Sequence, residues 1–176
     1  MRAQDIKRRI KEFFFANPTQ RLRVRQIERE VKVPLPSAIR YAKELEKQGI
    51  LKSTIVAKVK LYSSDRASKS FLLEKKMFNI FILYSSGLIN YITTEYGNPN
   101  IIVFGSYAKG EDIEKSDVDL YVETAKNVER LETFEKKLRK KIQVFEYKNI
   151  SFVENRELAN NILNGVILNG FVEVFR

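Results

Sequence analysis

The sequence predicts an α+β protein in which a helical domain precedes a small mixed α/β domain. Three observations support this prediction. Apolar residues recur with helical spacing through the first fifty positions, basic residues are concentrated in the same region, and apolar runs of strand length alternate with helical segments in the second half. We therefore expect a first domain over residues 1–62, a linker and long helix over residues 63–97, and an α/β domain over residues 98–176.

Three helices are expected at the start of the chain. The first covers residues 3–16 and ends at Asn17-Pro18, because the residue before a proline is disfavoured in the α region. A short second helix follows. The third runs to about Gln48, with Ser37 as its cap or in its first turn and Gly49 as its C-terminal stop.

A basic hairpin is expected after these helices. Residues 50–52 and 55–62 read as strands, and the second run alternates so that Lys58 and Lys60 share a face. The polar side of the third helix is also basic. Its exposed stripe is predicted to consist of Ser37, Arg40, Lys43 and Lys47.

The excess of positive over negative charge lies entirely in residues 1–62. The net charge of the chain is +10. Residues 1–62 carry 16 Lys and Arg against 6 Asp and Glu, whereas residues 63–176 carry 16 of each. A solubilising face would scatter such an excess, so we favour a nucleic-acid-binding module beside a neutral domain.

Three helices followed by a basic hairpin resemble a winged helix-turn-helix domain. Such domains place the third helix in the major groove of double-stranded DNA and the wing on flanking phosphates. The resemblance implies a DNA-binding surface made of Ser37, Arg40, Tyr41, Lys43, Lys47, Lys52, Lys58 and Lys60. Two alternatives stay open. In the first, Tyr41 belongs to the core and Glu44 pairs with a neighbouring Lys or Arg side chain. In the second, the domain binds a protein.

A long apolar helix is expected from about Arg66 to Tyr96. Its aromatic residues lie on several faces, which indicates burial against the following sheet and across a homodimer. Ser85-Ser86-Gly87 is expected to kink or split it.

Two short motifs dominate the second half. An apolar strand over residues 101–104 runs into Gly105-Ser106, and a second strand carries Asp117 and Asp119. Because side chains alternate on a strand, these two carboxylates share a face and repel one another unless a cation lies between them. Hard oxygen ligands suit Mg²⁺ or Mn²⁺. Gly105 allows the backbone to approach a ligand closely, and Ser106 offers a hydroxyl and a backbone N–H to phosphate.

Gly105-Ser106, a spacer and Asp117-x-Asp119 together resemble the signature of the DNA polymerase β-like nucleotidyltransferase superfamily. The closest resemblance is to its minimal prokaryotic members, over roughly residues 98–147. It implies transfer of a nucleoside monophosphate from a nucleoside triphosphate, with Gly105 and Ser106 on the phosphates and the two aspartates on the metals. Lys109 would steady the triphosphate, although plain surface charge explains it equally well.

The resemblance also implies an acceptor. Minimal members of the superfamily add nucleotides to a hydroxyl of a partner protein, often a toxin modified by its antitoxin, and others modify small molecules. A protein acceptor or toxin partner is therefore expected. Nothing in the sequence selects among these acceptors.

The superfamily pattern includes a third acid on the next strand, expected here over residues 141–147. The matching position is Gln143, which is neutral and cannot act as a base. Glu146 is the nearest acid, but three residues along a strand place it on the opposite face unless a bulge intervenes. Asp112 and Glu114 are more distant candidates. Two functions remain: a metal-dependent transferase tethered to DNA, or a catalytically reduced regulator or antitoxin that binds DNA or nucleotide without transfer.

The remaining elements are an amphipathic helix over residues 127–139, a helix from about Asn155 to Leu168 and a short strand over residues 171–175.

Composition limits the chemistry and the location. The hydrophobic content of 44% is that of a globular protein. The chain has no cysteine and no histidine, so any metal must rest on oxygen ligands. Because the N-terminus lacks the apolar run of a signal peptide and the most apolar segment is short, we expect a cytoplasmic protein without membrane contact. The absence of cysteine and the Lys/Glu/Ile-rich usage favour a thermophile.

Overall fold

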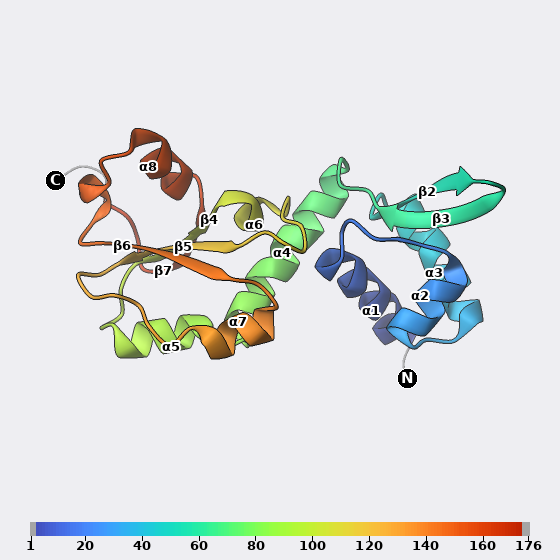
Figure 1. The fold of residues 1–176 in the computed structure, drawn as a ribbon, viewed down its shortest axis with the longest axis horizontal. Coiled ribbons are helices and arrows are strands. Elements are labelled where there is room, and N and C mark those ends of the chain that lie inside the picture. Colours follow the sequence, from blue (N-terminus) through green and yellow to red (C-terminus); the bar gives the residue numbers. More distant parts are fainter. Residues whose placement is uncertain (1–2, 174–176) are drawn as a thin grey trace. The chain divides into compact units, whose positions relative to one another are not determined.

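The computed structural model describes residues 3–173 of the chain. They form two compact units, Met1–Phe78 (unit 1) and Asn79–Arg176 (unit 2). The described residues contain eight α-helices and two sheets, so the chain is a mixed α+β protein as predicted (Figure 1).

Unit 1 contains three complete helices, the first part of a fourth and a small antiparallel sheet with strand order β1-β3-β2. Its core is one cluster of buried residues that includes Ile10, Phe14, Ile27 and Leu45. Its elements up to residue 64 are α1 (Ala3–Ala16), β1 (Arg21–Leu22), α2 (Val24–Val31), α3 (Leu35–Lys47), β2 (Leu51–Val56) and β3 (Val59–Ser64).

Helix α3 begins two residues before Ser37. Pro34 occupies the N-cap in an extended conformation, and a second proline lies in the first turn, where its missing N–H is not needed. Ser37 therefore lies inside the first turn and does not cap the helix.

The hairpin differs from the expected pair of strands. Residues 55–62 are not one strand, because Ala57 and Lys58 both have positive φ (46° and 64°) and form the turn between β2 and β3. Two consecutive residues with positive φ are typical of the turn whose twist matches antiparallel strands. The alternation predicted across residues 55–62 is therefore broken at Lys58.

The long helix predicted over residues 66–96 is split into α4 (Lys69–Ser85) and α5 (Leu88–Glu95). Gly87, with φ of 85°, separates them. The Ser86 hydroxyl donates to the Leu83 carbonyl near the end of α4 and accepts from the N–H of Leu88, the first residue of α5. The division between the two units falls within α4.

Unit 2 is a four-stranded sheet of order β6-β5-β4-β7, with β5 parallel to β6 and both other pairs antiparallel. Helices α5 and α7 cover one face of the sheet and α8 covers the other (Figure 1). The elements are β4 (Ile101–Phe104), α6 (Gly105–Lys109), β5 (Val118–Glu123), α7 (Glu132–Leu138), β6 (Ile142–Tyr147), a 3-10 turn (Ile150–Phe152), α8 (Arg156–Leu163) and β7 (Val166–Asn169).

Helix α7 is shorter than the predicted helix over residues 127–139. Two N–H groups of the preceding segment donate to side chains instead of to a helical ladder: Val128 donates to Glu146 Oε1 (3.0 Å) and Glu129 to the Tyr96 hydroxyl (2.9 Å). Val128 still packs against the core. The apolar spacing was therefore a correct guide to burial but not to the helix boundary.

The C-terminal elements also differ. The helix predicted from about Asn155 to Leu168 begins at Arg156 with Asn155 as its cap, but it ends at Leu163, and the last strand of the sheet is β7. Residues 171–173 are not a strand. The rest of the strand predicted over residues 171–175, Val174 and Phe175, lies outside the described residues.

Candidate functional site

Gly105 and Asp119 are in direct contact. Residue 104 at the end of β4 is in register with Asp119 on β5, so the first residue of α6 lies against the Asp119 carboxylate. Gly105 has φ of 70°, and a Cβ built on it would lie 2.4 Å from Asp119 Oδ2. No side chain fits there without moving the carboxylate, so glycine is required both by conformation and by this close approach.

The two aspartates form a charged pair at the start of β5. Asp119 is half-buried on the strand, and Asp117 is exposed directly before it. Burial, and secondly the charge of Asp117, raise the pKa of Asp119 above its ordinary value. The carboxylates therefore interact electrostatically and are stabilised by any cation between them.

Gln143 is the residue on β6 that faces this pair. The parallel register places it opposite Asp119, on the same face of the sheet. The register is unbroken, so Glu146 pairs with Val122 on the opposite face. Its carboxylate accepts the N–H of Val128. The structure thus brings Gln143 to Asp119 and does not bring Glu146 there.

No group of three or more acidic residues able to hold a metal occurs among residues 3–173. The acids at the site are Asp117 and Asp119. Of the other predicted nucleotide-binding residues, Ser106 is half-buried in the first turn of α6 and Lys109 is exposed at its end.

A buried ion pair holds the loop that leads to Asp117. Asp112 is 1% exposed. Lys140 Nζ lies 3.1 Å from its Oδ2, and Asn79 Nδ2 donates to its Oδ1 at 2.7 Å. Lys140 also donates to the carbonyls of Ile113 (2.5 Å) and Ser116 (3.2 Å). The lysine therefore fixes the backbone immediately before Asp117.

Asn79 connects Asp112 to Tyr107 of α6. Asn79 also donates to the Tyr107 carbonyl at 2.8 Å, and burial, followed by the Asp112 charge, raises the pKa of Tyr107. From the sequence, Asp112 is only a distant candidate for the third acid. Its partners lie 28 and 33 positions away in the sequence, so no local spacing could have revealed the pair.

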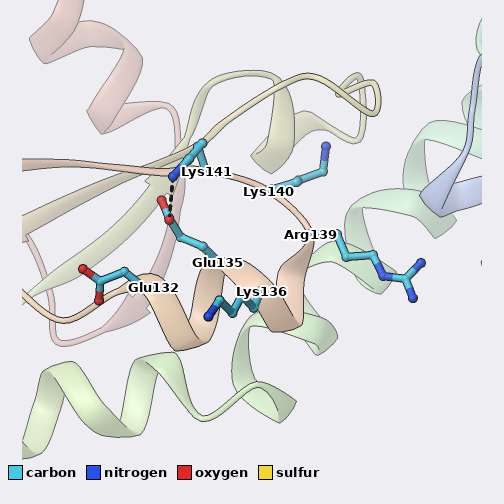
Figure 2. Close-up of a pocket in the computed structure, with 6 residues that line it drawn as sticks. All are labelled: Glu132, Glu135, Lys136, Arg139, Lys140 and Lys141. Atoms are coloured by element: carbon cyan, nitrogen blue, oxygen red, sulfur yellow. Dashed lines mark hydrogen bonds and ion pairs between the residues drawn. The ribbon is translucent and has the colours of Figure 1, made fainter.

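A pocket of about 420 Å³ lies beside this network, along α7 and the start of β6 (Figure 2). Within it, Lys141 Nζ lies 2.9 Å from Glu135 Oε2. Figure 2 shows Arg139 pointing away from that ion pair. The pocket is lined by Glu132, Glu135, Lys136, Arg139, Lys140 and Lys141. Because Gly105, Ser106, Asp117 and Asp119 are not among its lining residues, the pocket is not the site that the motifs predict.

The residues predicted to bind DNA fall into two groups. Lys43, Lys47 and Lys58 are exposed. Lys52 and Lys60 are also exposed, but each is in an ion pair: Lys60 lies 3.0 Å from Glu46, and Lys52 lies 3.9 Å from Asp65.

Two residues of α3 that were considered for base contacts are engaged within unit 1. Tyr41 is 4% exposed, and its hydroxyl accepts a hydrogen bond from Arg40, whose guanidinium also lies 4.4 Å from the ring centroid. Glu44 pairs with Lys7 of α1 at 2.5 Å. Ser37 is half-buried.

None of the helices in the described part of the chain has the length and apolarity that crossing a membrane requires.

Residues 86–168 match the family model described as nucleotidyltransferase domain. The matched range runs from α5 to β7, ending one residue before the end of that strand, and it covers slightly less than half of the chain. Comparison with curated proteins gave no match, and neither did comparison with solved structures. The family match supports a nucleotidyltransferase fold for residues 86–168 and suggests transfer of nucleoside monophosphates in general.

Proposed function

We propose that unit 2 binds a nucleoside triphosphate with Mg²⁺ or Mn²⁺ and transfers its nucleoside monophosphate to an acceptor, while unit 1 binds double-stranded DNA. One observation carries the transferase part. Gly105 and Asp119 are in contact at the junction of β4 and α6, and Asp117, directly before β5, is close enough for its charge to contribute to the raised pKa of Asp119.

The acidic pair suits a divalent ion. Mg²⁺ is usually bound by one or two carboxylates together with substrate phosphates, and a cluster of three acids is not needed for that mode. The mutual repulsion that contributes to the raised pKa of Asp119 would be relieved by such an ion. Asp117 and Asp119 would hold it, and the Gln143 carbonyl would be a neutral additional ligand.

The roles of the other residues follow from their positions. Gly105 and Ser106 would lie along the phosphates, because glycine allows close approach and serine supplies a hydroxyl. A bound divalent ion would neutralise charge on the phosphates during displacement of pyrophosphate. Lys109, exposed at the end of α6, would interact with the outer phosphates. The acceptor would be a hydroxyl of a partner protein, such as a toxin, or of a small molecule.

The DNA-binding part of the proposal concerns α3 and the β2–β3 hairpin. The order α1-β1-α2-α3-β2-β3 fits a winged helix-turn-helix domain, in which the third helix enters the major groove. Exposed Lys43 and Lys47 on α3 and Lys58 in the hairpin turn would contact phosphates. A homodimer belongs to the same proposal, since such domains commonly read paired half-sites.

Gln143 favours a second candidate function. An amide at the position facing Asp119 supplies no charge and no base, so nucleotide binding without transfer is the alternative. In that case unit 2 would be the nucleotide-binding part of a DNA-binding regulator or antitoxin.

Isothermal titration with ATP, GTP, CTP and UTP, with and without Mg²⁺, tests the proposal. We expect Mg²⁺-dependent binding of at least one nucleotide in the wild type and its loss in Asp117→Asn/Asp119→Asn. The matched control is Glu146→Gln, which changes an acid on the neighbouring strand outside the site and should bind normally. If no nucleotide binds to the wild type, the transferase proposal fails.

A second experiment distinguishes transfer from binding. It uses a nucleoside triphosphate labelled at the α-phosphate and a cell extract as the source of acceptors. Label transferred by the wild type and lost with Asp119→Asn supports the transferase. Binding without transfer in the wild type, together with transfer in Gln143→Glu, supports the second candidate.

A further inference from the structure

The β2–β3 hairpin of unit 1 presents aliphatic side chains at its tip. The hairpin begins in the core, where Leu51 is 1% exposed. At its far end, directly before the turn at Ala57 and Lys58, Ile55 is 77% and Val56 is 52% exposed. Among the described residues, Ile55 is the most exposed of the large hydrophobic side chains. The hairpin therefore extends beyond the core of unit 1 and carries apolar residues into solvent.

This tip differs from ordinary protein surface. Single exposed hydrophobic residues are common, but Ile55, Val56 and Ala57 are consecutive and all exposed. A run of three exposed apolar residues at the end of a strand favours aggregation, so it is expected only where it serves a function. The tip is therefore a candidate for a binding surface.

The apolar tip is flanked by positive charge. The hairpin sequence from Leu51 to Ser64 contains three lysines and no acidic residue. Lys58 lies in the turn, and Lys60 is directly opposite Ile55 in the antiparallel register. Both lysines are exposed. Apolar side chains between cations suit a polyanion with an apolar interior, and duplex DNA, with phosphates outside and stacked bases inside, has that chemistry.

The tip lies on the α3 side of the hairpin. Because side chains alternate along a strand, Ile55 shares a face with Ser53, whose hydroxyl donates to Glu46 near the end of α3. Glu46 lies one turn after the exposed Lys43 and directly before the exposed Lys47. The hairpin is thus anchored beside the α3 lysines that are proposed to contact DNA.

We propose that Ile55 inserts between base pairs from the minor groove of the bound duplex and bends it. The inference rests on the proposed DNA binding by unit 1. Paired strands lie about 4.8 Å apart and the minor groove is about 6 Å wide, so only the tip of the hairpin, and not its broad face, can enter. Aliphatic side chains inserted there partly unstack a base step and kink the duplex by about 20–90°. Lys58, in the turn, contacts a phosphate beside the inserted side chain.

Insertion gives unit 1 a sequence preference that needs no hydrogen bond to a base. Unstacking costs less at flexible pyrimidine–purine steps such as TA than within a stiff A-tract. Ile55 is β-branched and has few rotamers, so little side-chain freedom is lost when it is inserted. The bound sequence is therefore selected in part by how easily it bends.

Two other occupants fit the tip less well. Ile55 and Val56 together offer too little apolar area to hold the hairpin on a lipid surface, where even one long acyl chain gives only marginal binding. The centre of a protein interface is depleted of lysine, whereas Lys58 and Lys60 flank this tip. Both arguments favour DNA.

Two end-labelled duplexes of equal length and base composition test the proposal, one with central TA steps and one with a central A-tract. We expect the wild type to bend the TA duplex, measured as increased energy transfer between the end labels, and to bind it more tightly than the A-tract duplex. Ile55→Ser should lose the bend and the preference but keep the salt dependence of binding, because its phosphate contacts are unchanged. Lys58→Ala should instead keep the bend and reduce the slope of log K against log salt by about 0.9.

The matched control is Ile167→Ser, the same substitution at an isoleucine of unit 2 that is 51% exposed, and it should bend DNA like the wild type. Circular dichroism melting curves check that each variant is folded. If Ile55→Ser bends the TA duplex as the wild type does, or if the wild type binds both duplexes equally without bending them, insertion is overturned while DNA binding by unit 1 stands, and the tip is left for a protein partner. A wild type that binds neither duplex overturns DNA binding itself, and insertion with it.

Discussion

The two units differ in their balance of charged residues and in the roles proposed for them. Residues 1–78 carry 20 Lys and Arg against 8 Asp and Glu, whereas residues 79–176 carry 12 against 14. In unit 1 the exposed charges are the proposed functional groups. In unit 2 the proposed site is built by backbone register and close contact: Asp119 lies against Gly105, and Lys140 with Asp112 fixes the loop before Asp117.

This difference predicts how each function responds to mutation. A site fixed by buried contacts is lost when one contact is removed, because the group left behind is desolvated and has no alternative partner. A site made of exposed charges loses binding in small steps, since each charge contributes separately. Substitutions in the two units should therefore differ in the size of their effects.

The largest effect is expected for Lys140→Met. It leaves the Asp112 carboxylate buried without its cation, which costs about 3–5 kcal/mol in the free energy of unfolding of unit 2. Urea unfolding followed by circular dichroism measures this loss. The control is Lys136→Met, an exposed neighbour on α7 that should change stability by less than about 0.5 kcal/mol.

A double variant sharpens this prediction. Asp112→Leu added to Lys140→Met should recover much of the lost stability, because an apolar pair replaces the uncompensated charge. Equal stability of Lys140→Met and Lys136→Met would contradict the role given to the buried pair.

A smaller effect is expected for Gly105→Ala, compared with Gly97→Ala. Both glycines have positive φ (70° and 74°), so each substitution costs about 1–2 kcal/mol in backbone conformation. The Gly97 Cβ would meet no atom within 4 Å, whereas that of Gly105 would displace the Asp119 carboxylate. Titration should show loss of Mg²⁺–nucleotide binding in Gly105→Ala and none in Gly97→Ala. Equal binding by the two variants would show that nucleotide binding does not depend on the contact between Gly105 and Asp119.

Smaller still is the effect of single lysines on DNA binding. Lys47→Ala should weaken binding evenly across sequences and reduce the slope of log K against log salt by about 0.9. Lys60→Ala should change the slope less, because Lys60 already pairs with Glu46. Fluorescence anisotropy at several salt concentrations measures both slopes. A slope that does not change with Lys47→Ala would show that this residue is not on the DNA.

The smallest effect is expected for Ser53→Ala in the hairpin. The hydrogen bond from Ser53 is the main cause of the lowered pKa of Glu46, so its removal should raise that pKa toward the ordinary value. A lowered folded-state pKa stabilises the fold above the ordinary pKa of glutamate, and this contribution disappears as the pH falls through the lowered pKa. The variant should therefore lose less than about 1 kcal/mol near neutral pH and nothing at strongly acidic pH. NMR titration of Glu46 measures the shift, and an unchanged pKa would contradict the assignment.

The elements that the sequence predicted best are those with strong local signals. Asn17-Pro18, Gly49 and Ser85-Ser86-Gly87 mark helix ends correctly because their effects on the backbone are local. The two strands around Gly105 and Asp119 were also predicted, since an apolar run before glycine and alternating aspartates are local signals. Their antiparallel register was not predicted.

The features that the sequence did not reveal depend on distant partners. The segment before α7 has helical spacing, but Tyr96 and Glu146 bind its N–H groups. Asp112 and Lys140, 28 positions apart, lie together in the structure because each lies in the segment that leads into one of the paired strands β5 and β6. The turn at Ala57 and Lys58 lacks the glycine or asparagine that usually marks positive φ. The alternating pattern therefore predicted one strand across residues 55–62, where the structure has a turn.

The central claim is that Asp117 and Asp119, held against Gly105, bind a divalent ion together with a nucleoside triphosphate. Electron paramagnetic resonance of Mn²⁺, titrated with the protein in the presence of a nucleotide that binds in the calorimetric experiment, tests it most directly. The account predicts a bound Mn²⁺ signal that requires nucleotide, is lost in Asp119→Asn and Gly105→Ala, and persists in Glu146→Gln. A signal that persists in Asp119→Asn, or is lost in Glu146→Gln, would contradict the placement of the metal at this pair.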